Sequence, residues 1–340
     1  MTRTVDWRDD RVVTIDQTLL PGELRFVELT TVDEVVDAIR RLVIRGAPAI
    51  GVAGALGVAL AVREAERTGA GDDAVRADAA RIRAARPTAV NLAWAVDRVL
   101  ARLPDGRDAL VAEAVAMLDE DEAACEALSR RGAAYLGSLR PGAWRVHTHC
   151  NAGALATVDW GTALGVVRAL HEDGLVHHVI ADETRPLLQG ARLTAFELER
   201  LGVPYRIAVD GAAASLIARG LVDVVIVGAD RVAANGDAAN KIGTYPLALA
   251  AARAGIPFVV AAPESTIDMC TATGADIHIE ERDADEVLTF AGVRTAPPGA
   301  GALNPAFDVT PNDLITALVT EARVVCLAVG ETLATSIGRH

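Results

Sequence analysis

The sequence contains almost no lysine: of its 33 basic residues only Lys241 is a lysine, and arginine occupies every other basic position. A compact ammonium group can reach a phosphate as a point charge, which a planar guanidinium does less readily. Lys241 also lies in the most densely patterned stretch of the chain, residues 224–244. It is therefore either a contact to a small anion or a chance survivor on a solvated loop.

The sequence also lacks paired cysteines and the common cofactor signatures. The four cysteines are far apart and form no C-x-x-C pair, so their spacing gives neither a disulfide framework nor a zinc ligand set. No G-x-G-x-x-G follows a predicted strand, and the spacing of a Walker loop is missing. These spacings therefore give no sign of a zinc site or of a dinucleotide-binding site.

Acidic residues outnumber basic ones by 46 to 33, which gives a net charge of −13. Such a charge argues against nucleic acid or an anionic membrane as a partner, and a small anionic ligand would need a locally positive site. The first ten residues have no apolar signal core, and the uncharged run at residues 47–62 is short and rich in glycine and alanine. The sequence therefore predicts a reduced cytoplasmic protein that does not span a membrane.

Residues 1–137 are predicted to form a mainly helical domain with a small β element at residues 12–15 and 25–29. Thr31 and Glu34 form a capping-box pattern, and apolar residues follow at helical spacing. Residues 47–62 are apolar on all sides, as in a buried helix. Residues 74–85 and 108–136 carry mixed charge and many alanines, which favours amphipathic helices.

Residues 143–340 follow a break at residues 137–142 and are predicted to form a Rossmann-like α/β domain. Short apolar runs occur at residues 144–149, 178–181, 205–209, 222–227, 257–262 and 324–328. Segments with helical character lie between them, at residues 153–171, 191–201, 211–219 and 239–254. This alternation predicts a parallel sheet covered on both faces, with ligands bound beyond the carboxyl ends of its strands.

Cys150 follows the first predicted strand of this sheet and precedes a predicted helix. A helix N-terminus would favour a thiolate, whereas a free cysteine elsewhere is commonly a small buried hydrophobe. His147 and His149 alternate along the same strand, and two histidines without a carboxylate make a weak case for a metal.

The second strand ends in the polar cluster Asp182, Glu183 and Arg185, which is either an ion-pair loop or part of a site. Gln189 could present its amide to a hydroxyl group. Asp230 follows a fully apolar strand, where desolvation would raise its pKa and suit a proton donor, although aspartate is also common as a turn cap. The following loop, with its glycine, amides and Lys241, resembles a phosphate cradle at a helix start.

The N-terminal domain offers Arg45, Gly46 and Ala47 immediately before a proline that suits the first turn of a helix. Exposed amides and an arginine at a helix N-terminus suit an anion, and ordinary helix initiation is the alternative. Arg86 precedes a similar proline-led pattern.

Nine motifs in order along the chain closely resemble those of the methylthioribose-1-phosphate isomerase family. Each motif alone is weak, but the ordered set covers nearly the whole chain and is highly specific. They are Arg45-Gly-Ala-Pro-Ala-Ile-Gly51, Arg86-Pro-Thr-Ala-Val-Asn-Leu92, His149-Cys-Asn-Ala-Gly153, Ala181-Asp-Glu-Thr-Arg-Pro186, Gln189-Gly-Ala-Arg192, Gly228-Ala-Asp-Arg231, Asn235-Gly-Asp237, Asn240-Lys-Ile-Gly243 and Asn304-Pro-Ala-Phe-Asp-Val-Thr-Pro311.

The resemblance implies an aldose–ketose isomerase of methionine salvage that acts on a sugar phosphate, is homodimeric and needs no metal and no organic cofactor. It implies that Cys150 is the active-site cysteine and Asp230 the proton donor. The substrate-binding positions that it implies are Arg45, Gly46, Ala47, Arg86, Gln189, Asn240 and Lys241. The methylthio group would need an apolar wall, for which Trp94 is a candidate.

Two alternatives remain open from the sequence. The chain could be an isomerase of another pentose 1-phosphate, such as 5-deoxyribose 1-phosphate or ribose 1,5-bisphosphate. It could also be a non-catalytic sugar-phosphate-binding subunit, because the superfamily includes regulatory subunits of a eukaryotic translation-initiation exchange factor. Those subunits share the fold but not the Cys/Asp pair.

Overall fold

The N-terminal part is built around one apolar helix, α2 (Ala47–Thr68), in a computed structural model that describes residues 3–86 and 89–334. Because α2 is apolar on nearly every side, other helices must surround it. They are α1 (Val32–Arg40), α3 (Asp72–Arg83), α4 (Val90–Leu100) and the first half of α5 (Arg107–Leu139). The predicted capping box at Thr31 and Glu34 is present at the start of α1.

Helix α2 is longer than the apolar run in the sequence indicates. With 22 residues it is the one helix among the described residues that is long and apolar enough to cross a membrane. Its most apolar stretch, however, is 83% buried inside the protein. The prediction that this segment is too short to span a bilayer is therefore wrong. Because α2 is mostly buried inside the protein, it is a core helix.

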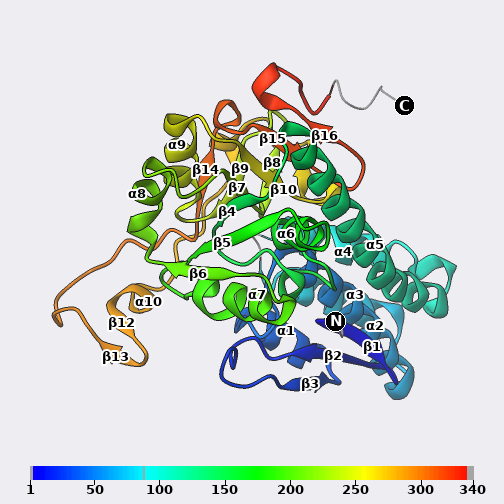
Figure 1. Cartoon of the computed structure of the whole chain (residues 1–340). Coiled ribbons are helices and arrows are strands. Elements are labelled where there is room, and N and C mark those ends of the chain that lie inside the picture. The colour runs from blue at the N-terminus through cyan, green and yellow to red at the C-terminus, as the bar shows by residue number, and fades with distance from the viewer. Residues whose placement is uncertain (1–2, 87–88, 335–340) are drawn as a thin grey trace.

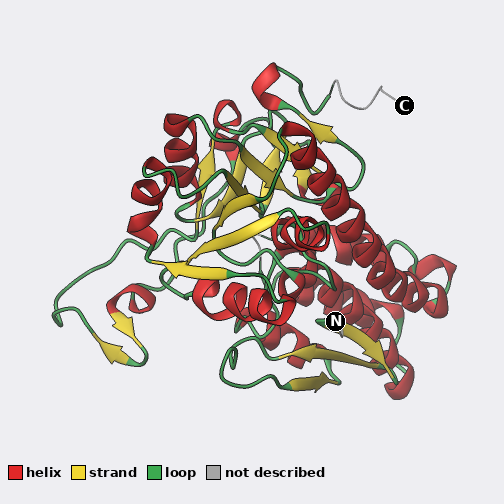
Figure 2. Ribbon diagram, in the orientation of Figure 1, coloured by secondary structure: helices red, strands yellow, loops and turns green. Residues whose placement is uncertain are grey.

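A three-stranded antiparallel sheet lies beside these helices, with strands in the order β1-β2-β3. Its strands are β1 (Val5–Arg8), β2 (Arg11–Ile15) and β3 (Phe26–Leu29). The sequence predicts β2 and β3, but not β1. Figures 1 and 2 show this sheet and the helices together at one end of the molecule.

The second part contains a seven-stranded sheet in the order β16-β15-β10-β7-β4-β5-β6, parallel except for β16. The strands are β4 (Trp144–Thr148), β5 (Val176–Asp182), β6 (Tyr205–Ala208), β7 (Val224–Val227), β10 (Phe258–Ala261), β15 (Ala317–Val319) and β16 (Val324–Val325). The predicted fold class is confirmed. Strand β15 was not predicted, and the predicted final strand is the short antiparallel β16.

The strand order reverses between β4 and β7. The chain first adds β5 and β6 on one side of β4, and then adds β7, β10 and β15 on its other side. In open sheets of this kind the crevice at such a switch point is where ligands bind. Cys150 follows β4 and Asp230 follows β7, so the topology brings both to this crevice.

Helices cover both faces of the sheet (Figure 2). One face packs against α5, α6 (Ala163–Glu172) and α7 (Ala195–Leu201). The other face packs against α8 (Ala213–Ala218) and α9 (Thr244–Ala254). The predicted helix at residues 153–171 is wrong in its first half, because α6 begins only at Ala163, and the predicted helix at residues 239–254 begins as a strand.

A second, four-stranded sheet in the order β11-β8-β9-β14 carries Lys241. Its strands are β8 (Arg231–Ala233), β9 (Ala238–Lys241), β11 (Ile267–Asp268) and β14 (Phe307–Thr310). Helix α10 (Asp285–Leu288) leads into the hairpin β12 (Thr289–Phe290) and β13 (Val293–Arg294), which stands away from the main body in Figure 1.

Short helical turns make most of the remaining regular structure. They are η1 (Leu103–Asp105), η2 (Ala154–Ala156), the π-turn η3 (Gly190–Thr194), η4 (Asp210–Ala212), η5 (Glu264–Thr266), η6 (Gly274–Asp276), η7 (Asn312–Leu314) and η8 (Leu327–Val329).

Candidate active site

A cavity of about 860 Å³ receives residues from both parts of the chain, at the carboxyl ends of β4 and β7. The nine residues that the sequence analysis assigns to catalysis or substrate binding all line this one cavity. They are Arg45, Gly46, Ala47, Arg86, Cys150, Gln189, Asp230, Asn240 and Lys241. Residues spread over almost two hundred positions are thus brought together.

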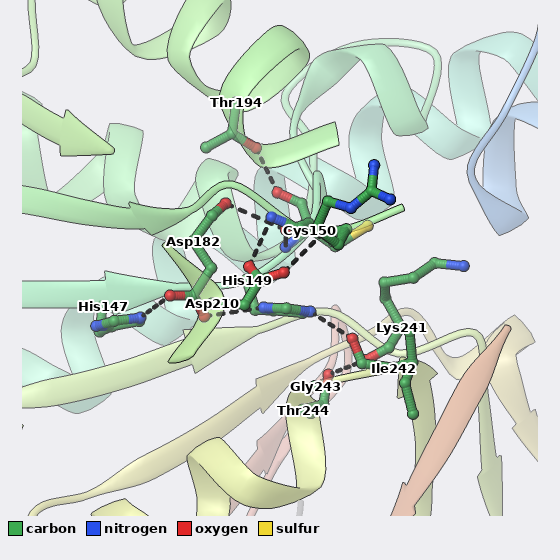
Figure 3. A network of polar contacts seen from close by, with 12 residues as sticks. His147, His149, Cys150, Asp182, Thr194, Asp210, Lys241, Ile242, Gly243 and Thr244 are labelled. Atoms are coloured by element: carbon green, nitrogen blue, oxygen red, sulfur yellow. Dashed lines mark hydrogen bonds and ion pairs between the residues drawn. The ribbon is translucent and has the colours of Figure 1, made fainter. Parts of the chain in front are cut away.

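Cys150 is held by its backbone in the left-handed region, with φ of 61°. Its N–H donates to Thr184 Oγ1 at 2.9 Å, and its carbonyl accepts from Thr194 Oγ1 at 2.6 Å (Figure 3). The expectation of a helix N-terminus here is wrong, because only the short turn η2 precedes α6. Burial raises the pKa of the Cys150 thiol, and the nearby charges of Arg45 and Lys241 offset part of that rise. The net rise favours the thiol over the thiolate.

Asp230 lies between β7 and β8, with its N–H donating to the Ala239 carbonyl at 2.9 Å. Its side chain faces the cavity and is partly exposed there. Burial raises the pKa of the Asp230 carboxyl, while Lys241, Arg86 and Arg45 act in the opposite direction. The rise favours the protonated acid, as the sequence predicts for a proton donor.

Lys241 is the last residue of β9, and its side chain is almost fully buried. Its Nζ donates to the Ala306 carbonyl at 2.8 Å and lies 4.6 Å from the centre of the Phe307 ring. Burial lowers the pKa of Lys241, against the attraction of Cys150 and Asp230. Lys241 is therefore neither on a solvated loop nor at a helix start.

Only part of the predicted phosphate cradle lines the cavity. Asn240, like Lys241, lines the cavity, and its amide donates to Thr244 Oγ1 at 3.0 Å. The turn at residues 235–237 does not line the cavity. Asp237 instead accepts the backbone N–H of Asn312 at 2.9 Å and of Gly274 at 2.9 Å, which is a structural role. The prediction was wrong for that turn.

Arg45, Gly46 and Ala47 form the entry to α2. Gly46 is the N-cap with φ of 92°, and a Cβ there would overlap Ala156. Arg45 donates to the Asn151 carbonyl at 2.8 Å and also to the Asn151 side chain, so it links the helix start to the strand end that carries Cys150. Helix initiation and cavity lining are thus combined in one segment.

Arg86 is largely buried at the cavity wall, with its guanidinium 3.7 Å from the Glu280 carboxylate. Burial lowers the pKa of Arg86, although the charges of Glu280 and Asp230 oppose the change. The adjacent Pro87 and Thr88, on which the proline-led helix start was predicted, lie outside the described residues, and α4 begins at Val90.

Gln189 is 6% exposed and its Oε1 has no hydrogen-bond partner among the described residues. A buried amide oxygen without a partner costs free energy unless a ligand satisfies it. Because Gln189 lines the cavity, this oxygen suits a ligand hydroxyl.

Several cavity residues were not predicted as site residues. The lining carries seven cationic side chains against four acidic ones, which provides the local positive charge that an anion needs in an acidic protein. Arg41, Arg192 and Arg282 are the unpredicted cations, whereas Arg185 belongs to the polar cluster that the sequence left open as part of a site. Arg192 falls in a quoted motif, whereas Arg282 lies in an irregular segment with no sequence signal.

Asn151 lines the cavity and Glu197 lies behind it, and the sequence predicted a role for neither. Asn151 donates to Glu197 Oε1 at 2.7 Å, and it accepts from Arg45. Burial raises the pKa of Glu197 to about 7, with the Asn151 contact opposing the change. Asn151 directly follows Cys150 and could have been found from the motif, but Glu197 gives no local signal.

The polar cluster after β5 is not an ion-pair loop. Asp182 accepts from His147 Nε2 at 2.9 Å and contacts His149 Nδ1 at 2.9 Å, so the two histidines do share a carboxylate. Arg185 donates to backbone carbonyls of Pro186 and Val287. Glu183 takes part through its backbone, in bonds with Ala208 and Ala191.

His149, Asp182 and Asp210 could in principle surround a metal ion, because their ligand atoms lie within 4.8 Å of one another. His149 Nε2 is also occupied, 2.8 Å from the Ile242 carbonyl. Hydrogen bonds within the protein to Asp182 and to Ile242 therefore account for the position of both ring nitrogens.

The apolar wall of the cavity does not include Trp94. That side chain is 43% exposed on α4 and lies 5.6 Å from the guanidinium carbon of Arg98. The apolar lining comes instead from Leu42, Ile50, Leu187, Leu188, Phe290 and Phe307.

Comparison with known proteins gives one matching family, described as the initiation factor 2 subunit family, over residues 43–325. A methylthioribose-1-phosphate isomerase from Anaeromyxobacter sp. is 58% identical over 316 residues, covering 93% of this chain and 91% of that protein. A 5-deoxyribose 1-phosphate isomerase from Moorella thermoacetica is 52% identical, covering 94% of this chain and 93% of that protein.

A Nocardia farcinica protein, named a probable bifunctional methylthioribose-1-phosphate isomerase and methylthioribulose-1-phosphate dehydratase, is 58% identical over 95% of this chain. The chain spans 59% of the length of that protein.

Two solved structures share the fold over the same extent. The 5-methylthioribose 1-phosphate isomerase of Pyrococcus horikoshii matches with a TM-score of 0.87 and 43% identity, covering 96% of this chain and 93% of that chain. The structure titled translation initiation factor eIF-2B, subunit delta, from A. fulgidus matches with a TM-score of 0.83 and 41% identity, covering 96% of each chain.

Proposed function

The chain belongs to the initiation factor 2 subunit family, and from this premise we propose that it is an aldose–ketose isomerase. Its substrate is 5-methylthioribose 1-phosphate and its product 5-methylthioribulose 1-phosphate, a reaction of methionine salvage. The relatives named above support this reaction. The observation that carries it for this chain is the meeting of Cys150 and Asp230 in one cation-lined cavity at the switch point of the sheet.

The chemistry assigned to Asp230 is opening of the sugar ring. The phosphate ester locks the anomeric carbon of the substrate, so the ring cannot open by simple mutarotation. A carboxylic acid kept protonated by burial can donate its proton to the ring oxygen as the bond breaks. Asp230 is the acid of the cavity that is placed for this role.

Cys150 is proposed to move a proton between C2 and C1 through an enediol-like intermediate, or to stabilise that transition state. The rival route is a direct hydride shift from C2 to C1. Reaction in heavy water distinguishes them: deuterium at C1 of the product supports proton transfer, whereas its complete absence favours the hydride shift or a proton shielded from solvent.

The substrate phosphate is proposed to bind where the start of α2 meets Lys241 and Arg86. Backbone N–H groups at a helix N-terminus and fixed cations both stabilise a phosphate. Arg45, Gly46 and Ala47 supply that helix start. Gln189 and Asn240 are proposed to contact the sugar hydroxyls, because both residues line the cavity.

A substrate panel tests the proposed function. Purified protein is expected to isomerise the methylthio substrate with a higher kcat/KM than the 5-deoxy or 5-phospho analogues, because the cavity offers an apolar wall for the methylthio group. A preference for 5-deoxyribose 1-phosphate would favour the activity of the Moorella relative. Stoichiometric ligand binding without any turnover would support the second alternative, a regulatory subunit. The similarity to the A. fulgidus structure, which is titled as an initiation-factor subunit, is the observation that favours this alternative.

Lys241→Arg is expected to fold normally and to raise KM about tenfold or more. The larger, planar guanidinium cannot take the place of a buried ammonium between Ala306 and Phe307, and one charge-assisted contact to the phosphate is worth about 1.5–3 kcal/mol. Steady-state kinetics measure the change. Arg67→Lys, on the exposed end of α2, is the matched control. An unchanged KM for Lys241→Arg would mean that the sequence keeps a lysine at position 241 by chance.

The protein is further proposed to be a cytoplasmic homodimer. The relatives are bacterial and archaeal enzymes, which agrees with a cytoplasmic site, and the dimer follows from the family resemblance. Light scattering coupled to size-exclusion chromatography would contradict the dimer if the mass were that of one 35.5 kDa chain.

A further inference from the structure

His149 is bonded to oxygen atoms through both of its ring nitrogens. Nδ1 lies 2.9 Å from Asp182 Oδ2, and Nε2 lies 2.8 Å from the Ile242 carbonyl oxygen (Figure 3). Neither a carboxylate nor a carbonyl can donate a proton, and neutral imidazole carries only one N–H. Both contacts are therefore satisfied as hydrogen bonds when His149 is the doubly protonated imidazolium.

The surroundings of His149 are predominantly acidic. His147 Nε2 supplies the second donor to Asp182, and Asp210 lies on the other side, where it accepts the N–H groups of Thr184 and Arg185. Burial lowers the pKa of His149, but the hydrogen bond and charge of Asp182 outweigh it, and Asp210 adds to the effect, so the net pKa is raised.

The Ile242 carbonyl belongs to the segment that follows Lys241. Gly243, with φ of 106°, packs against the imidazole so closely that a Cβ would lie 2.7 Å from His149 Cε1. Asp308 accepts the Gly243 N–H at 2.8 Å and the Tyr245 N–H at 3.1 Å. Hydrogen bonds with His149 and Asp308 thus hold the backbone of residues 242–245 in place.

We propose that His149 is a positioning residue that ties the strand end carrying Cys150 to the strand end carrying Asn240 and Lys241. This role rests on the proposed function of the cavity, because His149 is next to Cys150 in the chain and its partner Ile242 is next to Lys241. His149 does not touch the substrate; it fixes the distance between the group that reacts and the groups that hold the phosphate.

The tie is sensitive to pH in a defined direction. The folded pKa of His149 is above the ordinary value of 6.5, so the contact is fully present below that value and is lost as pH rises through the folded pKa. The remaining proton stays on Nδ1, facing the carboxylate of Asp182, and the Nε2 lone pair then faces the Ile242 carbonyl. Repulsion between them loosens Lys241, so KM rises with pH.

Two substitutions at His149 separate its two contacts. The amide nitrogen of His149→Asn takes the place of Nδ1, and that of His149→Gln takes the place of Nε2. His149→Asn is therefore expected to lose the Ile242 contact and to raise KM about tenfold, the loss of one charge-assisted hydrogen bond. His149→Gln keeps a donor toward Ile242, and its KM is expected to rise less, about threefold, and to lose the pH dependence that the wild type shows.

His147→Gln is the matched control. It keeps a donor toward Asp182 from the same buried cluster but has no contact with the Ile242 segment, so KM and its pH dependence are expected to stay as in the wild type. Thermal unfolding of each variant checks that a change in KM does not come from a loss of folded protein.

Nitrogen NMR of the wild-type imidazoles gives a readout that does not depend on turnover. At pH 6, below the ordinary pKa of histidine, both His149 nitrogens are expected at the shifts of protonated imidazolium, and a neutral tautomer would overturn the proposal. Equal KM values for His149→Asn and His149→Gln would overturn it as well. If the wild type does not turn over the methylthio substrate, the proposed function fails instead, and the NMR result still decides the charge of His149.

Discussion

Asp230→Asn is expected to lower kcat roughly 10²–10⁴-fold with little change in KM, the range that a positioned general acid supplies. An amide has the size of the carboxylic acid but no proton to give to the ring oxygen. The backbone N–H of residue 230 still donates to Ala239, so the turn is retained. Steady-state kinetics with the methylthio substrate measure the loss.

The matched control for this variant is Asp9→Asn, on an exposed turn with φ of 49°, a conformation that asparagine tolerates. It should leave kcat unchanged. The wild type adds a second check: because burial raises the pKa of Asp230, the donating acid is present below that pKa and kcat falls as pH rises through it. Near-normal turnover of Asp230→Asn would remove Asp230 as the proton donor.

Cys150→Ser is the second substitution with a large expected effect, a fall in kcat of roughly 10²–10⁴-fold. The hydroxyl is a much weaker acid than the thiol, so it is a poorer group for moving a proton between C2 and C1. The contacts to Thr184 and Thr194 are made by the backbone of residue 150 and do not depend on sulfur. The variant should therefore fold and bind substrate.

Circular dichroism and kcat together test this expectation, with Cys270→Ser as the control because Cys270 is exposed and does not line the cavity. If Cys150→Ser and Asp230→Asn both kept normal kcat in folded protein, the assignment of the cavity as the active site would be wrong.

Much of the fold could be predicted from the sequence because buried parallel strands are unbroken apolar runs. Runs such as residues 222–227 leave little choice of structure, and the rule for carboxyl ends then places Cys150 and Asp230 at one edge. The pairing of Asp182 with His147 follows from the same rule, since β4 and β5 are neighbours, but the order of strands is needed to see it.

The failures come from apolar segments that are buried without being helical. Residues 153–162 look helical, but Gly153 and Gly161 form an isolated bridge, and a side chain at either would overlap buried neighbours. Such a segment is apolar because it is enclosed, and composition does not separate this from a helix. Ala238 and Ala239 are likewise good helix formers held in β9 by pairing with β14.

Helix α5 has a consequence for how this chain can be divided. At 33 residues it is about 50 Å long. Leu110 and Met117 near its start belong to the core around α2, whereas Leu128 and Leu136 belong to the core beneath the parallel sheet. A fragment beginning at residue 143 would keep α6 and α7 but lose the α5 side chains from that face of the sheet, and we expect it to aggregate. We therefore expect the smallest soluble piece that contains the sheet to start inside α5, ahead of Leu128, because this one helix contributes side chains to both cores.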